Sequence, residues 1–240
     1  MTKKSPLSRR DIQSFTQEIG KYGLPPRKKD YYGIIYRILE KNNIKSVLDI
    51  GTASGDFLYF MPETIKGLGI DKSKDLIKIA KDTRKKKNLK FECADILSDK
   101  FDKKYECITI LGTLLTFLDF RPALEACFNL HPKLIIINDF FNTDGIDIQL
   151  GFRYANKPKN AYQFAYNIVS LATMKSFLEE KSAQFSFEEY KLKTRLHRDE
   201  AHPMYNYHAE LNGETIITNG MGLILRGYNL IIIPKGNYGV

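Results

Sequence analysis

The chain of 240 residues contains no tryptophan, three cysteines and four histidines. Cys93, Cys107 and Cys127 form no Cys-x-x-Cys pair and fall in segments expected to be buried, so we expect reduced, structural thiols. The histidines show no recognised zinc-ligand spacing. These shortages exclude a disulfide scaffold and a zinc module, and we predict that the protein holds no metal.

Long apolar runs are also missing, since none approaches the roughly 20 residues that a membrane-spanning helix requires. The N-terminal stretch is basic but lacks the apolar centre of a secretory signal, and we therefore expect a cytoplasmic location. Hydrophobic residues make up 43% of the sequence, which at this length suits one well-packed α/β domain with a modest extension.

Acidic residues are fewer than basic ones, which leaves a formal net charge of +9. This surplus has two explanations: an acidic partner, such as a nucleic acid or a phosphorylated small molecule, or a lysine-rich background on solvated helices. We favour the second, because the charges are spread through predicted helices and accompanied by Asp and Glu. The densest run, Arg84 to Lys87, falls where a helix-to-strand loop is expected.

The segment Ser46–Phe57 contains the strongest motif of the chain, an apolar run followed by two glycines four residues apart. It predicts a buried parallel strand, a tight turn and a helix start. Asp49 would lie near the end of the strand, at the sheet edge where ligands bind in open α/β folds. Gly51 and Gly55 would supply the unusual backbone dihedrals of the turn, and Ser54 would cap the helix.

Two further acidic residues follow predicted strands. A strand over Ile65–Asp71 ends in a carboxylate about 20 residues beyond the glycine turn, the separation at which an acid reaches a ribose hydroxyl. Ser73 is expected to cap a helix over 74–83. A third strand over Leu89–Cys93 leads to Asp95, which on its own is an ordinary capping residue. Three acids at three successive strand ends favour a cofactor that carries a ribose.

The pattern Asp-x-Gly-x-x-x-Gly resembles the first motif of the class I, seven-strand S-adenosylmethionine-dependent methyltransferases, with Ala53 in place of the usual middle glycine. The alternatives are a βαβ unit with a purely structural turn, or a nicotinamide dinucleotide site, whose Gly-x-Gly-x-x-Gly spacing is absent. The resemblance implies S-adenosyl-L-methionine as cofactor. The cofactor-binding residues that it implies are Asp49, Gly51, Thr52, Gly55, Asp71, Lys72, Asp95, Ile96, Leu111 and Tyr32.

The fold expected from this resemblance is a Rossmann-like, seven-stranded, mostly parallel sheet with helices on both faces and an antiparallel last strand. Asn212-Gly213 predicts a β-hairpin over 205–218, inserted before the last strand. We expect residues 1–29 to form a basic extension or lid and residues 30–240 the methyltransferase domain. Within it, residues 183–240 would be the β-rich C-terminal segment.

We expect the methyl acceptor to bind at the ends of two later predicted strands, over 105–111 and 134–137. Asn138 and Asp139 follow the second of these, so Asp139 is the candidate general base and Asn138 a positioning residue. The alternative is that both satisfy backbone groups in a long turn. A C-terminal histidine, His202 or His208, is a further candidate base. The candidate acceptor-binding residues are Thr113, Arg153, Tyr154 and His208.

These features predict methyl transfer to a small polar acceptor, foremost an O-methylation of a sugar, nucleotide-linked or phosphoramidate acceptor. The segment 166–171 resembles bacterial methyltransferases that modify surface polysaccharides such as capsule. The alternatives are an N-methyltransferase, an RNA or protein methyltransferase, or a cofactor-binding module without activity. We do not expect a nucleic acid partner, and the protein would be a monomer or a homodimer.

Overall fold

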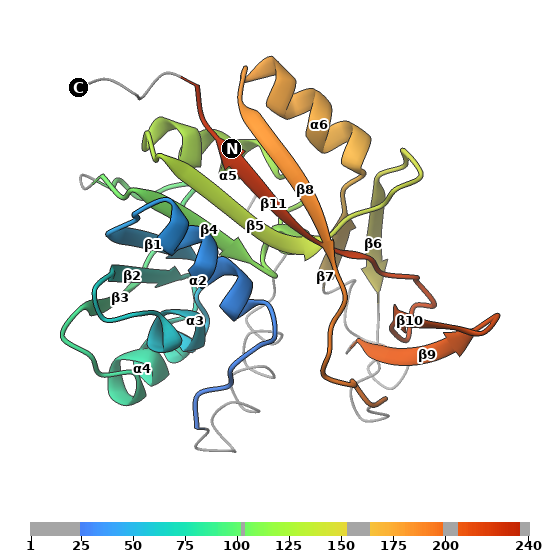
Figure 1. The fold of residues 1–240 in the computed structure, drawn as a ribbon, viewed down its shortest axis with the longest axis horizontal. Helices are drawn as coiled ribbons and strands as arrows, with labels where there is room; N and C mark the ends of the chain where they lie inside the picture. Colours follow the sequence, from blue (N-terminus) through green and yellow to red (C-terminus); the bar gives the residue numbers. More distant parts are fainter. Residues whose placement is uncertain (1–24, 102–103, 153–163, 199–205, 236–240) are drawn as a thin grey trace.

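The computed structural model describes residues 25–101, 104–152, 164–198 and 206–235. Its main sheet has seven strands in the order β3-β2-β1-β4-β5-β11-β8 (Figure 1). The first five of these are mutually parallel, and β11 is antiparallel to both of its neighbours. This confirms the predicted Rossmann-like sheet. The strands are β1 (Ser46–Ile50), β2 (Lys66–Asp71), β3 (Leu89–Cys93), β4 (Cys107–Leu111), β5 (Leu134–Phe140), β8 (Gln184–Tyr190) and β11 (Gly227–Ile233).

Helices cover both faces of the sheet (Figure 1). β1 is apolar on both sides. Val47 belongs to the hydrophobic cluster on one face of the sheet, and Leu48 and Ile50 belong to the cluster on the opposite face. This two-sided burial is what a central parallel strand requires. The helices are α2 (Tyr32–Lys41), α3 (Asp56–Phe60) and α4 (Lys74–Thr83) on one face, and α5 (Arg121–Asn129) and α6 (Leu171–Glu180) on the other.

Side-chain caps define two of the helix starts. Ser73 accepts a hydrogen bond from the N–H of Leu76, as predicted, and Ser170 caps α6 in the same way. The predicted cap at Ser54 is wrong. Gly55, in the left-handed conformation with φ of 80°, is the residue before α3, and no side chain caps that helix. Gly55 thus stands between Ser54 and Asp56, the first residue of the helix.

Two hairpins lie beside the ends of β4 and β5 (Figure 1). The predicted one is β9 (Tyr207–Leu211) and β10 (Glu214–Thr218), joined by Asn212 and Gly213 with positive φ, the conformation of a type I′ turn. The other, β6 (Ile148–Phe152) and β7 (Phe164–Ile168), was not predicted. Both contribute to a small third hydrophobic cluster, whose buried members are Ile168 and Leu225. It stands apart from the two clusters of the main sheet.

The fifth strand is longer than predicted, and it includes the two candidate residues Asn138 and Asp139. β5 continues to Phe140 because β11 pairs with it along its length, with Gly227 opposite Phe140. Asn138 and Asp139 are therefore strand residues and do not belong to a turn that follows the strand. Their side chains point to opposite faces of the sheet, as successive strand residues must.

The thiols are only partly as expected. All three cysteines are free, and Cys107 and Cys127 are buried, but Cys93 is exposed because it ends the edge strand β3, which has a neighbour on one side only. Among the described residues, no helix is both long and apolar enough to cross a membrane. Nor do the described ranges of the chain gather three or more metal-ligating side chains into one group.

We predict that Gly51 tolerates alanine far less well than Gly112. Both glycines have φ of +70°, so each alanine incurs left-handed strain, about 1 kcal/mol. At Gly112 nothing lies within 4 Å of the new methyl group, whereas at Gly51 it would overlap the side chain of Thr113. Gly51→Ala should therefore lower the free energy of unfolding by about 3 kcal/mol in denaturant titrations.

The comparison contains its own control. Thr113→Ala should restore some of the stability of the Gly51→Ala protein and leave Gly112→Ala unchanged. Equal losses for the two glycine variants would contradict the close contact between Gly51 and Thr113.

Candidate cofactor and acceptor site

The carboxyl ends of β1, β2, β3, β4 and β5 meet along one edge of the sheet and gather most of the predicted site residues. The glycine turn after β1 folds back over β2, where the N–H groups of Gly51 and Thr52 donate to the carbonyl of Ile70 at 2.9 and 3.0 Å. Gly51, Ala53 and Gly55 all have positive φ. The turn is therefore a sequence of left-handed residues that only glycine or a small residue adopts at low cost.

Asp71, at the end of β2, is bound to the glycine turn and to the start of α4. Its carboxylate accepts hydrogen bonds from the N–H of Ala53 at 3.0 Å and from the N–H of Ser73 at 2.9 Å. Burial raises its pKa, and these two N–H groups oppose the rise. Each oxygen keeps lone pairs to spare, and the residue is half-buried, so two ligand hydroxyls could still donate to it.

Asp49 is buried and accepts a hydrogen bond from the Thr109 hydroxyl at 2.7 Å, which links β1 to β4. Burial raises the pKa of Asp49 to about 6, and the hydrogen bond from the Thr109 hydroxyl opposes the rise. Thr52 itself is buried, and its Oγ1 satisfies no hydrogen bond within the described residues. A carboxylate and a hydroxyl thus lie at the base of the turn.

Asp95 follows β3 and is paired with Lys72, whose Nζ lies 2.8 Å from its Oδ2. Its Oδ1 accepts from the N–H of Leu97 within the turn after β3, where no helix begins, so Asp95 is not a helix cap. Ile96 is buried in the cluster on the α5 and α6 side of the sheet. The structure therefore places Lys72, Asp95 and Ile96 together, next to the turn that carries Asp71.

The turn after β4 closes on the glycine turn. The Thr113 hydroxyl donates to the carbonyl of Gly51 at 3.4 Å, and Leu111 ends β4 half-buried.

Tyr32 is buried among aromatic rings of α2 and α3, with ring-centre distances of 5.1 Å to Tyr31 and 5.3 Å to Phe57.

Asp139 and Asn138 both have backbone or side-chain partners. The Asp139 carboxylate accepts from the N–H of Leu115 at 3.1 Å and of Phe140 at 2.9 Å. Burial raises the pKa of Asp139 to about 7 against the effect of these N–H groups. The Asn138 amide donates to Asn229 at 2.8 Å and accepts from the Tyr190 hydroxyl at 3.3 Å. Only Asp139 satisfies backbone groups, and both residues lie in β5, so the alternative of two residues that satisfy backbone groups in a long turn is wrong. Burial leaves Asp139 with a pKa suited to proton transfer.

His208 lies in β9, where its Nδ1 accepts from the N–H of Leu196 at 2.8 Å. A neutral ring in this position carries its proton on Nε2, so it must give up the Leu196 contact before it can accept a proton there. Three other candidates, His202, Arg153 and Tyr154, lie outside the described residues.

Two contributors to this edge were missed from the sequence. Tyr190, at the end of β8, contacts Asn138 through its hydroxyl and the Tyr31 ring at 5.8 Å. Lys29 precedes α2, and its Nζ lies 5.7 Å from the centre of the Tyr31 ring. Neither belongs to a motif, and only the fold brings them to the ends of β1 and β5.

Lys29 is held in place through its neighbour Asp30. The Asp30 carboxylate accepts from the backbone N–H groups of Lys193 and Thr194 at 2.8 and 2.7 Å, and from the Thr194 hydroxyl at 2.8 Å. At the other side, the N–H of Arg27 donates to Asp56 at 3.1 Å, at the start of α3. Residues 25–31, which we call the N-terminal strap, are thus attached on both sides of the edge.

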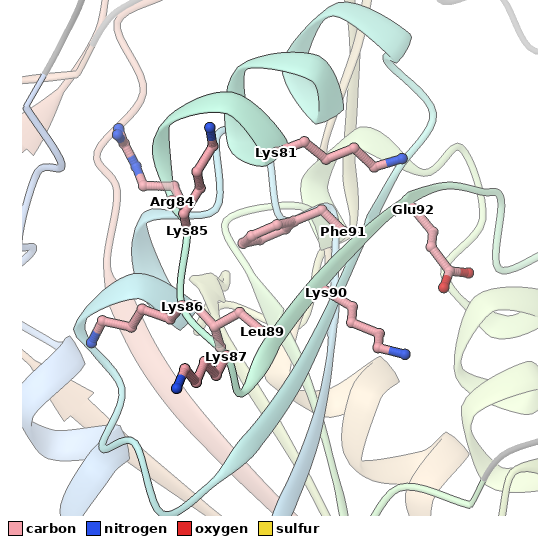
Figure 2. Close-up of a pocket in the computed structure, with 9 residues that line it drawn as sticks. All are labelled: Lys81, Arg84, Lys85, Lys86, Lys87, Leu89, Lys90, Phe91 and Glu92. Carbon is pink, nitrogen blue, oxygen red and sulfur yellow. The ribbon is translucent and has the colours of Figure 1, made fainter.

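The basic run predicted at 84–87 lies elsewhere, between α4 and β3. It borders an open groove of about 720 Å³ in which lysines surround Leu89 and Phe91 (Figure 2). Arg84 is buried there and forms an ion pair with Asp56 at 2.8 Å. None of the predicted site residues lines the groove, but Phe91 packs against Gly55 and Arg84 is paired with the next residue, Asp56.

The fold and this edge define a Rossmann-like methyltransferase. The residues at this edge fit a cofactor that carries a ribose and an adenine. The half-buried carboxylate at the end of β2 has free lone pairs, Asp95 after β3 is paired with Lys72, and the glycine turn lies beside β2. The family model described as "Methyltransferase domain" matches residues 41–199, and the chain belongs to that family. S-adenosylmethionine is its cofactor.

Solved structures share this fold at low sequence identity. YcgJ from Bacillus subtilis is 14% identical with a TM-score of 0.61, and the match covers 86% of this chain and 98% of that one. The DhpI complex with S-adenosylhomocysteine is 12% identical with a TM-score of 0.58, covering 97% and 98%. The N-terminal domain of EvdMO1, solved in the presence of S-adenosylhomocysteine and D-fucose, is 12% identical with a TM-score of 0.58, covering 97% and 100%. No curated protein sequence matches this chain.

The raised pKa of Asp139 predicts a pH-dependent stability. The folded protein holds a proton on this carboxyl up to about pH 7, whereas the unfolded chain releases it near its usual value of 3.8. Stability from this group is therefore complete below pH 3.8 and is lost as pH rises toward 7. Between pH 5 and pH 7 the loss should be roughly 2 kcal/mol, since one pKa unit corresponds to about 1.4 kcal/mol.

Asp139→Asn removes one titrating group and should make the slope in this region shallower when unfolding is followed in denaturant at each pH, with the part due to Asp49 remaining below about pH 6. The same slope in both proteins would show that Asp139 ionises in the folded state as it does in the unfolded chain.

Proposed function

We propose that the carboxyl edge binds S-adenosylmethionine along the turn after β1 and the ends of β2 and β3. Asp71 would accept the ribose hydroxyls, and Asp95 with Ile96 would hold the adenine. Asp49 and the turn after β4 would enclose the methionine end. The half-buried Asp71, fixed by Ala53 and Ser73 yet with free lone pairs, carries this assignment. The other residues assigned to the cofactor are Gly51, Thr52, Gly55, Lys72, Leu111 and Tyr32.

The acceptor would lie on the side of β4 and β5, under the two hairpins. The loop before α5 joins this side to β6 and β7, because the amides of Gln149 and Asn167 donate to the carbonyl of Leu118 at 3.1 and 2.7 Å. Thr113, at the start of that loop, faces the glycine turn and would contact both the methionine end and the acceptor. We assign His208 to the acceptor on its place in β9. Arg153 and Tyr154 are assigned on sequence alone, because they follow β6 in the chain.

The reaction that we propose is O-methylation of a small polar acceptor, a sugar or a sugar-linked molecule of surface glycan synthesis. Two observations support a sugar: the hairpins add a dedicated side to the site, and EvdMO1, solved in the presence of D-fucose, has the same fold. S-adenosylmethionine supplies an activated methyl group on a sulfonium, so the protein's task is to orient the acceptor and to remove its proton.

Asp139 is our candidate for that proton transfer. Its carboxylate is buried at the end of β5, its position is fixed by Leu115 and Phe140, and its pKa of about 7 makes it a base near neutral pH. Asn138 would act through the sheet, by holding Tyr190 and Asn229. His202 remains the alternative base.

The cofactor assignment is tested by calorimetric titration with S-adenosylhomocysteine. The wild-type protein should bind it at micromolar concentration, and Asp71→Asn should weaken binding at least tenfold, because hydrogen bonds to a carboxylate contribute about 1.5–3 kcal/mol. Asp75→Asn, an exposed carboxyl in the first turn of α4, is the matched control and should bind as the wild type does. Equal affinities for all three proteins would contradict the ribose assignment.

The acceptor is tested by incubating the protein with S-adenosylmethionine and a panel of free and nucleotide-linked sugars, with detection of methylated products by mass spectrometry. With an accepted sugar, the wild-type rate should rise with pH toward a plateau above pH 7, because Asp139 must be ionised. Asp139→Asn should lower turnover at least a hundredfold and leave cofactor affinity unchanged. A fully active variant would exclude Asp139 as the base.

A further inference from the structure

Tyr31, the last residue of the N-terminal strap, carries a hydroxyl group that no described residue binds. Only 5% of the residue is exposed, so its ring is enclosed. Within the described part of the chain, the hydroxyl has no hydrogen-bond partner. It is not sealed inside the protein either, because in those same residues Oγ1 of Thr52 is the only fully buried side-chain oxygen or nitrogen without a partner. The hydroxyl of a buried ring therefore meets accessible space.

A hydroxyl in this setting is available to a ligand. Burial raises the pKa of Tyr31, so the group keeps its proton at neutral pH and can donate it in a hydrogen bond. Buried tyrosines usually find a partner for this donor. Tyr36, also in the first turns of α2, shows the usual case, since its hydroxyl donates to the carbonyl of Phe57 at 2.6 Å. Tyr31 lacks such a contact, and a bound molecule could supply it.

Tyr31 lies at the part of the carboxyl edge where β4 and β5 end. Its ring centre is 5.8 Å from that of Tyr190, and the Tyr190 hydroxyl donates to Oδ1 of Asn138 at 3.3 Å. Asn138 is paired with Leu111, the last residue of β4, and its carbonyl accepts from the N–H of Gly112 at 2.7 Å. Tyr31 is thus joined by ring and hydrogen-bond contacts to the side assigned to the acceptor.

The position of Tyr190 depends on a glycine in the neighbouring strand. Gly227 of β11 lies opposite Tyr190, and a methyl group there would be 2.8 Å from two carbons of the ring. Because Gly227 has no side chain, the Tyr190 ring lies across β11 and its hydroxyl reaches Asn138 on β5, the strand beyond. The ring against which Tyr31 packs is therefore fixed.

Asp30 joins the two segments that carry these tyrosines. Its carboxylate accepts from the N–H groups of Lys193 and Thr194 at 2.8 and 2.7 Å, and from the Thr194 hydroxyl at 2.8 Å. Asp30 directly precedes Tyr31, and Lys193 and Thr194 follow closely after Tyr190. The protein alone thus sets the place of Tyr31, so binding a ligand requires little further ordering.

We propose that Tyr31 binds the methyl acceptor by donating its hydroxyl to an oxygen of that molecule, and that Tyr190 positions Tyr31. The inference rests on the proposed function of the ends of β4 and β5 as the acceptor side. A sugar hydroxyl or a phosphoryl oxygen would accept this hydrogen bond. Tyr32 packs in another direction, with its ring centre 5.3 Å from that of Phe57 in α3, and stays assigned to the cofactor.

Tyr31→Phe removes the hydroxyl alone. With the sugar methylated fastest in a panel of free and nucleotide-linked sugars that includes D-fucose, kcat/KM should fall about tenfold, the effect of one lost hydrogen bond. Calorimetric affinity for S-adenosylhomocysteine should change less than about twofold. The melting temperature should stay within about 1 °C, because no hydrogen bond within the described protein is lost.

Tyr36→Phe is the matched control in the same helix. It removes a hydroxyl that the protein does use, so it should lower the melting temperature by about 2 to 4 °C and leave kcat/KM for the same sugar unchanged.

Tyr190→Phe tests the positioning role. It releases the ring from Asn138 and should lower kcat/KM without changing the affinity for S-adenosylhomocysteine. In the double variant with Tyr31→Phe, the loss should be smaller than the product of the two single losses, because both changes act on one contact. Single losses that multiply would overturn the positioning role of Tyr190.

Two results would overturn the proposed contact. One is a Tyr31→Phe protein that methylates the sugar as the wild type does, which would mean that the hydroxyl meets only water. The other is a loss of S-adenosylhomocysteine affinity as large as the loss of kcat/KM, which would assign Tyr31 to the cofactor. A wild-type protein that binds S-adenosylhomocysteine but methylates no sugar of the panel would instead overturn the proposed acceptor, and the inference with it.

Discussion

The left-handed turn at Gly51 is the constraint on which the carboxyl edge depends. Because Gly51 has no side chain, Thr113 lies directly against it, and the turns that follow β1 and β4 come into contact. Gly69 has the same role on the neighbouring strand β2, since a methyl group there would overlap the side chain of Thr52. Missing side chains thus let neighbouring strand ends approach each other, and the acids of β1 and β2 lie on either side of one turn.

The same edge carries an electrostatic cost. Asp49 and Asp139 are buried with pKa values raised to about 6 and 7, so ionising them opposes folding. A protein selected for stability alone would replace both with apolar residues of similar size. For Asp49, the positively charged ligand proposed above would offset this cost when it binds.

The features that depend on a few neighbouring residues could be predicted from the sequence. Ser73 and Asn212-Gly213 were placed correctly because a capping hydroxyl and a type I′ turn are decided within a few residues. The acids at the ends of β1 and β2 followed from strand length and turn position in the same way.

Long-range pairing set the remaining features. β5 extends over Asn138 and Asp139 only because β11, about 90 residues later, pairs with it. Lys29 belongs to no motif, and its position depends on contacts between Asp30 and Thr194 across 164 residues of sequence. The β6–β7 hairpin also went unpredicted, although Ile148, Leu150 and Phe152 of β6 alternate with Gln149 and Gly151.

The separation of the hydrophobic clusters has a consequence for how such a protein diversifies. The hairpins pack mainly in the small third cluster around Ile168 and Leu225, whereas the strands that carry the acids pack in the two larger ones. Substitutions, insertions or replacement of the hairpins would therefore alter one side of the site while the sheet and its glycine turn keep their packing. New acceptor preferences could arise by changing this peripheral module alone, on a cofactor scaffold that stays the same.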